Sequence, residues 1–139
     1  MLLAPAAAAG LIVPGKSIRG VKLGMTQKQV RFLLGTPRKG VHGSNEFGSY
    51  TELRYATIEV SFQGETAVTN IATTSAADRT AGGIGVGSTK AAARKTFPGL
   101  RCEGRVCSLG RFLPGARVTS FWFTSAGRVG EVSVGLVID

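Results

Sequence analysis

An internal repeat is the feature that most constrains how this chain of 139 residues can fold. Residues 20–26 (GVKLGMT) align with residues 83–89 (GIGVGST), and their glycine, aliphatic and threonine positions match. Aromatic and aliphatic residues continue the match downstream, pairing Phe62 with Phe123, Val68 with Val129, and Ile71 with Val132. Matches spread along the whole chain predict a duplicated structural unit.

Each aligned block leads into the signal of a short helix. In the first block, Thr26 and Gln29 have the spacing of a capping box, in which each side chain bonds the backbone N–H of the other residue. Apolar residues at helical spacing follow, and a glycine and a proline then predict the end of the helix. In the second block, Ser88 or Thr89 is expected to cap a helix over residues 90–96.

The segments after each predicted helix alternate between apolar and polar residues, as half-buried strands do. Residues 57–62 (TIEVSF) and 119–123 (TSFWF) show this pattern, and Trp122 is the exception to it. We therefore predict an α+β fold of two tandem helix-plus-antiparallel-sheet units, the first over residues 16–77 and the second over residues 78–139. The helices are expected on one sheet face, with the other face open.

The N-terminal segment is apolar, uncharged and rich in alanine. Ala7-Ala8-Ala9 fits the small-residue pattern of a signal-peptide cleavage site. We interpret residues 1–15 as a signal-peptide remnant or a disordered N-terminus, which predicts a secreted or cell-envelope protein. The alternative is a flexible alanine-rich terminus of a cytosolic protein. No apolar stretch reaches the roughly 18 residues that a membrane-spanning helix needs.

Cys102 and Cys107 are the two cysteines of the chain, and the residues between them are typical of a tight hairpin turn. Two thiols that face each other across a hairpin can form a disulfide, and an even cysteine count in a secreted chain favours one. A metal site would need more ligands, and the single histidine, His42, is distant in sequence. A redox-active pair more often has the spacing C-x-x-C.

The positive charge of the chain is large but diffuse. The formal net charge is +9, and the 17 basic residues are scattered along the sequence. Dedicated nucleic-acid binders usually cluster their cations on one face or one helix, so we expect no nucleic-acid partner. Diffuse charge instead favours solubility and weak attraction to acidic surfaces.

The sequence gives little sign of an active site. The glycine-rich residues 82–90 resemble a phosphate-binding loop, but two residues separate the last glycine from Lys90, where the P-loop pattern has none. His42 lies in a stretch with the composition of a loop, and no aspartate near it in sequence completes a hydrolase triad. We therefore expect no enzyme activity, no cofactor and no metal site.

Residues 21–37 contain a pattern that resembles one shared by known protein families. The stretch VKLGMTQKQV, followed by LLGTP, resembles the opening "GMT-x-x-QV-x-x-LLG-x-P" that two related groups share. One group is the small lipoproteins of outer-membrane assembly, the SmpA/OmlA family, and the other is the secreted beta-lactamase inhibitor proteins of actinomycetes. The inhibitor proteins carry two such units in tandem. The resemblance implies helices on one sheet face, protein contacts on the other, and disulfides within a unit.

Strand alternation predicts which side chains the open face presents. If Phe121 and Phe123 point toward the helices, Trp122 points to the opposite face, where its repeat partner is Ser61. A tryptophan on an open sheet face is a common anchor for protein contacts. The alternative is that Trp122 covers the seam between the two sheets or packs under the loop near residue 114. The predicted protein-binding residues are Trp122, Tyr50, Arg54, Glu52 and Glu131.

Two functional hypotheses follow from these patterns. The first is a secreted, non-catalytic, inhibitor-like module that binds an extracellular or envelope protein through its open sheet face. The second is an envelope-associated structural protein that binds acidic cell-wall polymers through its diffuse positive charge. Salt distinguishes them, because it screens exposed charges more strongly than it weakens an interface centred on a tryptophan.

Overall fold

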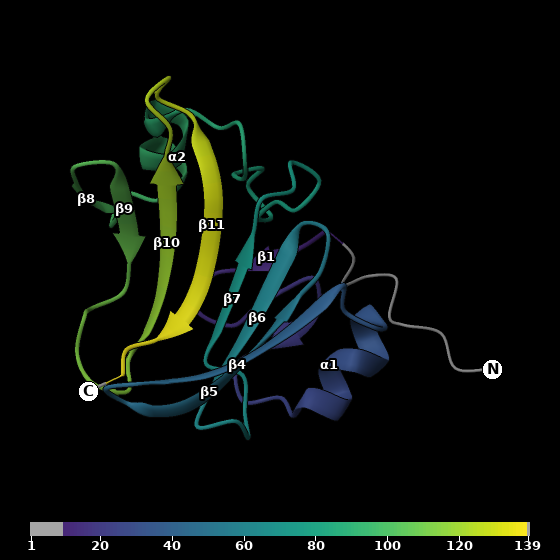
Figure 1. Ribbon diagram of the computed structural model, residues 1–139. Coiled ribbons are helices and arrows are strands. Elements are labelled where there is room, and N and C mark those ends of the chain that lie inside the picture. The colour runs from purple at the N-terminus through teal and green to yellow at the C-terminus, as the bar shows by residue number, and fades with distance from the viewer. Residues whose placement is uncertain (1–9, 139) are drawn as a thin grey trace.

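The computed structural model describes residues 10–138. Its strands form an eight-stranded antiparallel sheet and a separate three-stranded sheet, and two short helices accompany them (Figure 1). The elements in chain order are β1 (Ile12–Val13), β2 (Ser17–Ile18), β3 (Val21–Lys22), α1 (Gln27–Leu34), β4 (Lys39–Asn45), β5 (Gly48–Arg54), β6 (Ile58–Gln63), β7 (Asn70–Thr73), α2 (Lys90–Thr96), β8 (Arg101–Glu103), β9 (Val106–Leu109), β10 (Arg117–Phe123) and β11 (Val129–Leu136).

The large sheet runs without interruption across both predicted units, in the order β4-β5-β6-β7-β11-β10-β9-β8. Strands β7 and β11 join its two halves, with Ile71 opposite Val134 and Thr73 opposite Val132. The predicted fold class of two helix-plus-sheet units is therefore wrong. Strand is the main secondary structure, and pairing between β7 and β11 merges the expected sheets into one.

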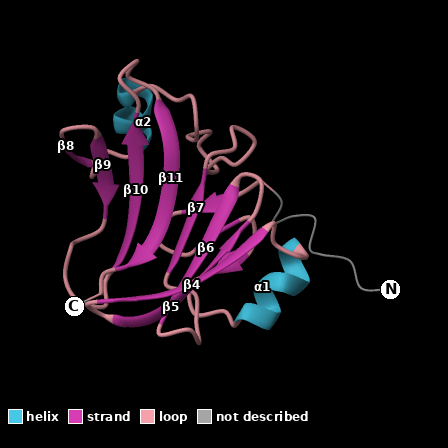
Figure 2. Cartoon of the chain, in the orientation of Figure 1, coloured by secondary structure: helices cyan, strands magenta, loops and turns pink. Residues whose placement is uncertain are grey.

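Both helices form where the sequence predicts them. The Thr26 side chain accepts from the Gln29 N–H at 3.2 Å, and the Gln29 side chain accepts from the Thr26 N–H at 2.9 Å, which completes the capping box of α1. Thr89, rather than Ser88, caps α2 by accepting from the Ala92 N–H. Figure 2 shows the helices apart, α1 beside the β4–β7 half and α2 beside the β8–β11 half.

The core lies on the inner face of the large sheet, defined here as the face toward the helices. Alternation places Phe62 and Phe121 there, and both side chains are fully buried. One residue of each helix, Val30 of α1 and Ala93 of α2, is buried in the same core cluster. Ring packing between Phe97 and Phe121, with centroids 5.9 Å apart, connects the end of α2 to β10.

The three-stranded sheet β1–β3 was not anticipated. Ile12, Ile18 and Val21 bring apolar side chains from it into the core cluster, where each is almost fully buried. Strand β1 lies ahead of residue 16, where the first unit is predicted to begin. Residues 1–9, including the predicted cleavage site, lie outside the described residues. Within residues 10–138, no helix has the length and apolar character needed to cross a bilayer.

A buried aspartate fixes the small sheet to the large one. Asp78 is 1% exposed and accepts from the Arg19 guanidinium at 2.6 Å and from the Thr73 hydroxyl. Arg19 follows β2, and Thr73 ends β7. Buried carboxylates are tolerated when they are paired and hydrogen-bonded in this way, so the three side chains connect the turn after β2 to the end of β7.

Candidate functional site

The outer face of the large sheet, turned away from the core, is the candidate site. Strand register places alternate residues of all eight strands on this face. Its central row runs from β4 to β8 and consists of Lys39, Arg54, Glu59, Ala72, Ser133, Ser120, Ser108 and Arg101. Charged residues thus occupy both ends of the row, and small or hydroxyl side chains occupy its middle.

Trp122 stands on this face, as the alternation predicts. It is 45% exposed, and its Nε1–H donates to the Ser133 hydroxyl on β11 at 3.4 Å. Its cross-strand neighbours are Glu131 on β11 and Val106 on β9. The seam between the halves lies between β7 and β11, and the Trp122 side chain reaches Ser133 on β11, the strand that borders this seam.

The predicted β5 residues Glu52 and Arg54 form an ion pair at 2.9 Å, and Arg54 lies 3.6 Å from Glu59 on β6. The hydrogen bond that the Arg54 guanidinium donates to Glu52 raises the pKa of Arg54, which stays charged. Burial raises the pKa of the Glu59 carboxyl, and repulsion from Glu52 adds to this effect. The longer contact to Arg54 lowers the pKa of Glu59, but by less than burial and Glu52 raise it. The charges of Glu52, Arg54 and Glu59 therefore do not balance completely.

Tyr50 lies at the same end of the sheet and packs over Gly43 on β4. A Cβ atom at Gly43 would sit 2.6 Å from the Tyr50 hydroxyl oxygen, so the ring depends on the missing side chain there. Tyr50 also lines a hollow of about 390 Å³ in which the tip of the β4–β5 hairpin meets the end of the chain at Leu136 and Ile138.

The five predicted binding residues therefore share one face but form two groups. Tyr50, Glu52 and Arg54 follow one another along β5, whereas Trp122 and Glu131 are a cross-strand pair on β10 and β11. Strands β6 and β7 separate the groups. At the usual strand spacing this separation is about 14 Å, so a single small ligand cannot contact both groups, whereas a protein surface can.

A hollow larger than the one beside Tyr50 was not predicted. It measures about 710 Å³ and lies at the β8 end of the face, between the β8–β9 hairpin and the loop after β9. Its walls include Arg101, Ser108, Arg111, Phe112 and Leu113. The side chains of Phe112 and Leu113 are 67% and 56% exposed. An apolar pair beside an arginine, in a loop that also holds Pro114 and Gly115, was the available sequence signal.

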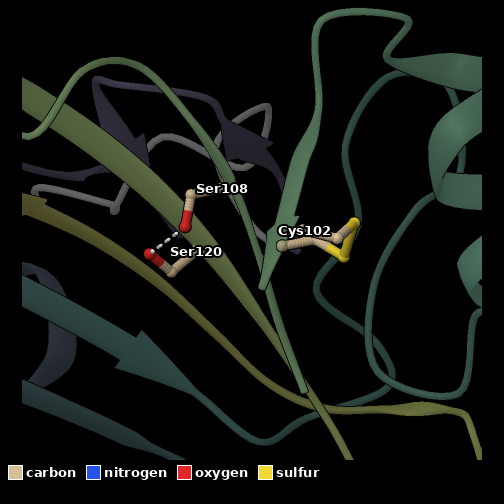
Figure 3. The surroundings of a disulfide bond; sticks show 4 residues. Cys102, Ser108 and Ser120 are labelled. Carbon is tan, nitrogen blue, oxygen red and sulfur yellow. Dashed lines mark hydrogen bonds between the residues drawn. A yellow bond between two sulfur atoms is a disulfide. The ribbon is translucent and has the colours of Figure 1, made fainter. Parts of the chain in front are cut away.

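Ser108, which lines this hollow, contacts Ser120 on the neighbouring strand β10. Ser108 and Ser120 are 6% and 7% exposed, and their hydroxyl oxygens lie 3.2 Å apart. On the other side of β9, the predicted disulfide links Cys102 to Cys107 (Figure 3). The disulfide thus joins β8 to β9 on the inner face, and the hydroxyl pair connects β9 to β10 on the outer face.

His42 and the glycine-rich segment occupy other parts of the fold. His42 lies in strand β4 rather than in a loop, with its Nδ1 atom 2.9 Å from the Thr51 hydroxyl and 3.6 Å from the Glu65 carboxylate. In the glycine-rich segment, the Arg79 guanidinium donates to the carbonyls of Gly83 and Val86. Among residues 10–138, no three His, Cys, Asp or Glu side chains gather as a metal site would require.

Comparison with known proteins identifies similar folds. No protein-family model and no curated protein sequence matches the chain. Its structure is similar to that of a DUF4309 family protein (YjgB) from Bacillus subtilis, with a TM-score of 0.57 and 14% identity over 94% of this chain and 90% of that one. It is also similar to an extracellular protein containing a SCP domain from Bacillus anthracis, with a TM-score of 0.57 and 10% identity over 81% of this chain. The chain spans 43% of that second protein, and at these identities the two likenesses show the fold alone.

Proposed function

We propose that this protein is a secreted, non-catalytic, inhibitor-like module that binds another protein through the outer face of its large sheet. The exposure of Trp122 on that face carries the proposal. A tryptophan that is 45% exposed on a strand leaves a large apolar surface in water. Its indole N–H is already bonded to Ser133, so the ring is held in place for a partner. Preorganised aromatic side chains of this kind often dominate binding energy at interfaces.

The surroundings of Trp122 also suit a protein partner. The small side chains of the central row leave the middle of the face flat, and charged residues border it on both sides. Trp122 supplies an exposed apolar anchor within this face, and charged residues at the border match the polar rim of a protein interface. The two groups of predicted residues would then contact separate parts of one partner surface, with Trp122 as the anchor and the β5 charges at the rim.

Secretion is the second part of the proposal. The Cys102–Cys107 disulfide supports it, because such bonds persist in oxidising compartments. The similar fold of the Bacillus anthracis protein, which is described as extracellular, is in keeping with the same location. The resemblance of residues 21–37 to the beta-lactamase inhibitor proteins supports an inhibitory role and names the first class of partner to test.

The test is affinity capture on the immobilised, oxidised protein. Purified beta-lactamases and a mixture of extracellular and envelope proteins are passed over wild type, Trp122→Ala and Phe32→Ala in moderate salt. Phe32 is the matched control, because it is an aromatic residue on α1 that is 58% exposed and far from the face. Trp122→Ala should weaken binding of a retained protein roughly 30-fold or more, and Phe32→Ala should leave it unchanged. Retention that is equal in all three variants would refute the proposal.

The high positive charge supports the alternative proposal of an envelope structural protein that binds acidic polymers. Attachment of that kind is screened by salt and does not depend on one aromatic residue. Material that all three variants retain and release below about 0.5 M salt would favour this alternative. Material that resists the same salt and requires Trp122 would favour the protein interface.

A further inference from the structure

The β8 edge of the sheet has free backbone hydrogen-bonding groups. Among residues 10–138, strand β8 is the last strand in the order of the sheet and pairs on one side only, with β9. The Cα atoms of Cys102 and Cys107 are 4.0 Å apart, which is the close spacing of a pair that is not hydrogen-bonded across the ladder. The N–H and C=O of Cys102 therefore point away from β9, toward the edge.

A hydrogen bond on the far side of β9 independently confirms the direction in which these backbone groups point. The Phe123 N–H donates to the Arg105 carbonyl at 2.7 Å, so odd-numbered residues of this segment bond toward β10. Even-numbered residues, Val106 and Ser108, consequently bond toward β8, where their partners are Glu103 and Arg101. Cys102 lies between Arg101 and Glu103. Its backbone N–H and C=O therefore point away from β9 and are available to an added strand.

The large hollow lies beside the same edge. Arg101, Cys102 and Glu103 of β8 form one wall, and the loop carrying Arg111, Phe112 and Leu113 forms another. Within residues 10–138, neither Arg101 nor Arg111 forms an ion pair with a carboxylate. Two unpaired guanidinium groups and an exposed apolar pair thus surround a space next to free backbone groups.

From this arrangement we infer that the β8 edge and its hollow bind an extended, acidic segment of a protein partner as an antiparallel ninth strand. The inference rests on the proposed protein-binding function and specifies one part of the partner. Backbone groups of the segment bond to Cys102, and alternate side chains enter the hollow. Carboxylates suit the two arginines, since guanidinium groups bind them in a bidentate, charge-assisted manner. Phe112 and Leu113 cover the aliphatic part of the same side chains.

The alternation gives a sharp test with synthetic peptides. In an antiparallel pair, directly opposed residues point to the same face. The residue opposite Cys102 therefore points to the inner face, and the residues on either side of it enter the hollow. In a rhodamine-labelled peptide of alternating Glu and Val, Glu occupies the hollow and the Val backbone bonds to Cys102. Fluorescence anisotropy against the full-length, oxidised protein should show binding of this peptide and much weaker binding of the matched Lys–Val peptide.

Protein variants and backbone-blocked peptides separate this mode from general attraction to a cationic protein. Arg101→Glu and Arg111→Glu should each weaken the Glu–Val peptide about tenfold. Lys28→Glu on α1 makes the same charge change far from the hollow and should have little effect. N-methylation of the Val residues should abolish binding, because it removes the N–H that bonds to Cys102, whereas N-methylation of the Glu residues should not.

Each arm also has a result that overturns the inference. Equal weakening by Lys28→Glu would show that net charge alone attracts the peptide. Equal binding of the two methylated peptides would exclude strand addition at this edge. Trp122 does not line the hollow, so Trp122→Ala should leave peptide binding intact. Loss of peptide binding and loss of the Trp122-centred interface can therefore be observed separately.

Discussion

The β4–β7 and β8–β11 halves of the outer face carry different chemistry on one continuous sheet. In the first half, Glu52, Arg54 and Glu59 contact one another. In the second half, Trp122 is exposed, and Arg101 and Arg111 contact no carboxylate among the described residues. The first half thus pairs three charges of its outer face with one another, whereas the second retains groups that a partner can satisfy.

This difference indicates where binding energy should be concentrated. A charge that is already paired must lose its partner or share it when a second protein arrives, and this lowers the gain from a new contact. An unpaired guanidinium or an exposed indole has no such cost beyond its desolvation. We therefore expect the second half to provide most of the affinity, and the β5 charges to affect the rate of association and its salt dependence.

The largest expected effect concerns whether the two halves unfold together, although their surface chemistry differs. Phe62 and Phe121 are fully buried and occupy the first and second halves of the core. Phe62→Ala and Phe121→Ala should each lower the free energy of unfolding by about 4 kcal/mol, because each leaves a large cavity. Since β7 and β11 join the halves, denaturant unfolding should remain a single transition in both variants. Two separate transitions would show that the halves fold independently.

A second test concerns the covalent link that only the second half has. Replacing Cys102 and Cys107 together by Ala should lower the free energy of unfolding by about 2 kcal/mol, the size expected for a crosslink that closes a short loop. The amides of β8 and β9 should lose hydrogen-exchange protection, and those of β5 and β6 should keep theirs. Wild-type protein held under reducing conditions is the control and should behave like the double variant. Uniform loss of protection over both halves would contradict a local role for the disulfide.

Local features of the sequence were sufficient to predict many parts of this structure. The capping box at Thr26, the helix after Thr89 and the Cys102–Cys107 hairpin each depend on residues only a few positions apart. Alternation correctly placed Trp122 on the face opposite Phe121, because strand side chains alternate whatever the sheet around them. Each of these signals involves residues close in sequence, and their spacing is enough to predict the local geometry.

Long-range features could not be obtained in the same way. Pairing of β7 with β11 joins segments that are far apart in sequence, and nothing in either strand specifies its neighbour. The strands of the small sheet have two residues each, too few to show a period. The hollow beside β8 depends on where the loop at Phe112 crosses the hairpin, which alternation does not address. The residues around His42 predict a loop, because the glycines of β4 obscure its strand pattern.

The smallest expected effect belongs to the first half and measures how completely its charges are balanced. Burial, together with repulsion from Glu52, raises the pKa of Glu59 above its ordinary value of 4.5. The folded protein therefore binds more protons than the unfolded chain between these two pKa values, so the free energy of unfolding should fall as pH rises through that interval. Carbon-detected NMR titration of the Glu59 carboxyl should give a midpoint above 4.5, and Glu59→Gln should remove this part of the pH dependence. A midpoint at or below 4.5 would show that Arg54 pairs fully with Glu59, and that the first half balances its charges more completely than its geometry indicates.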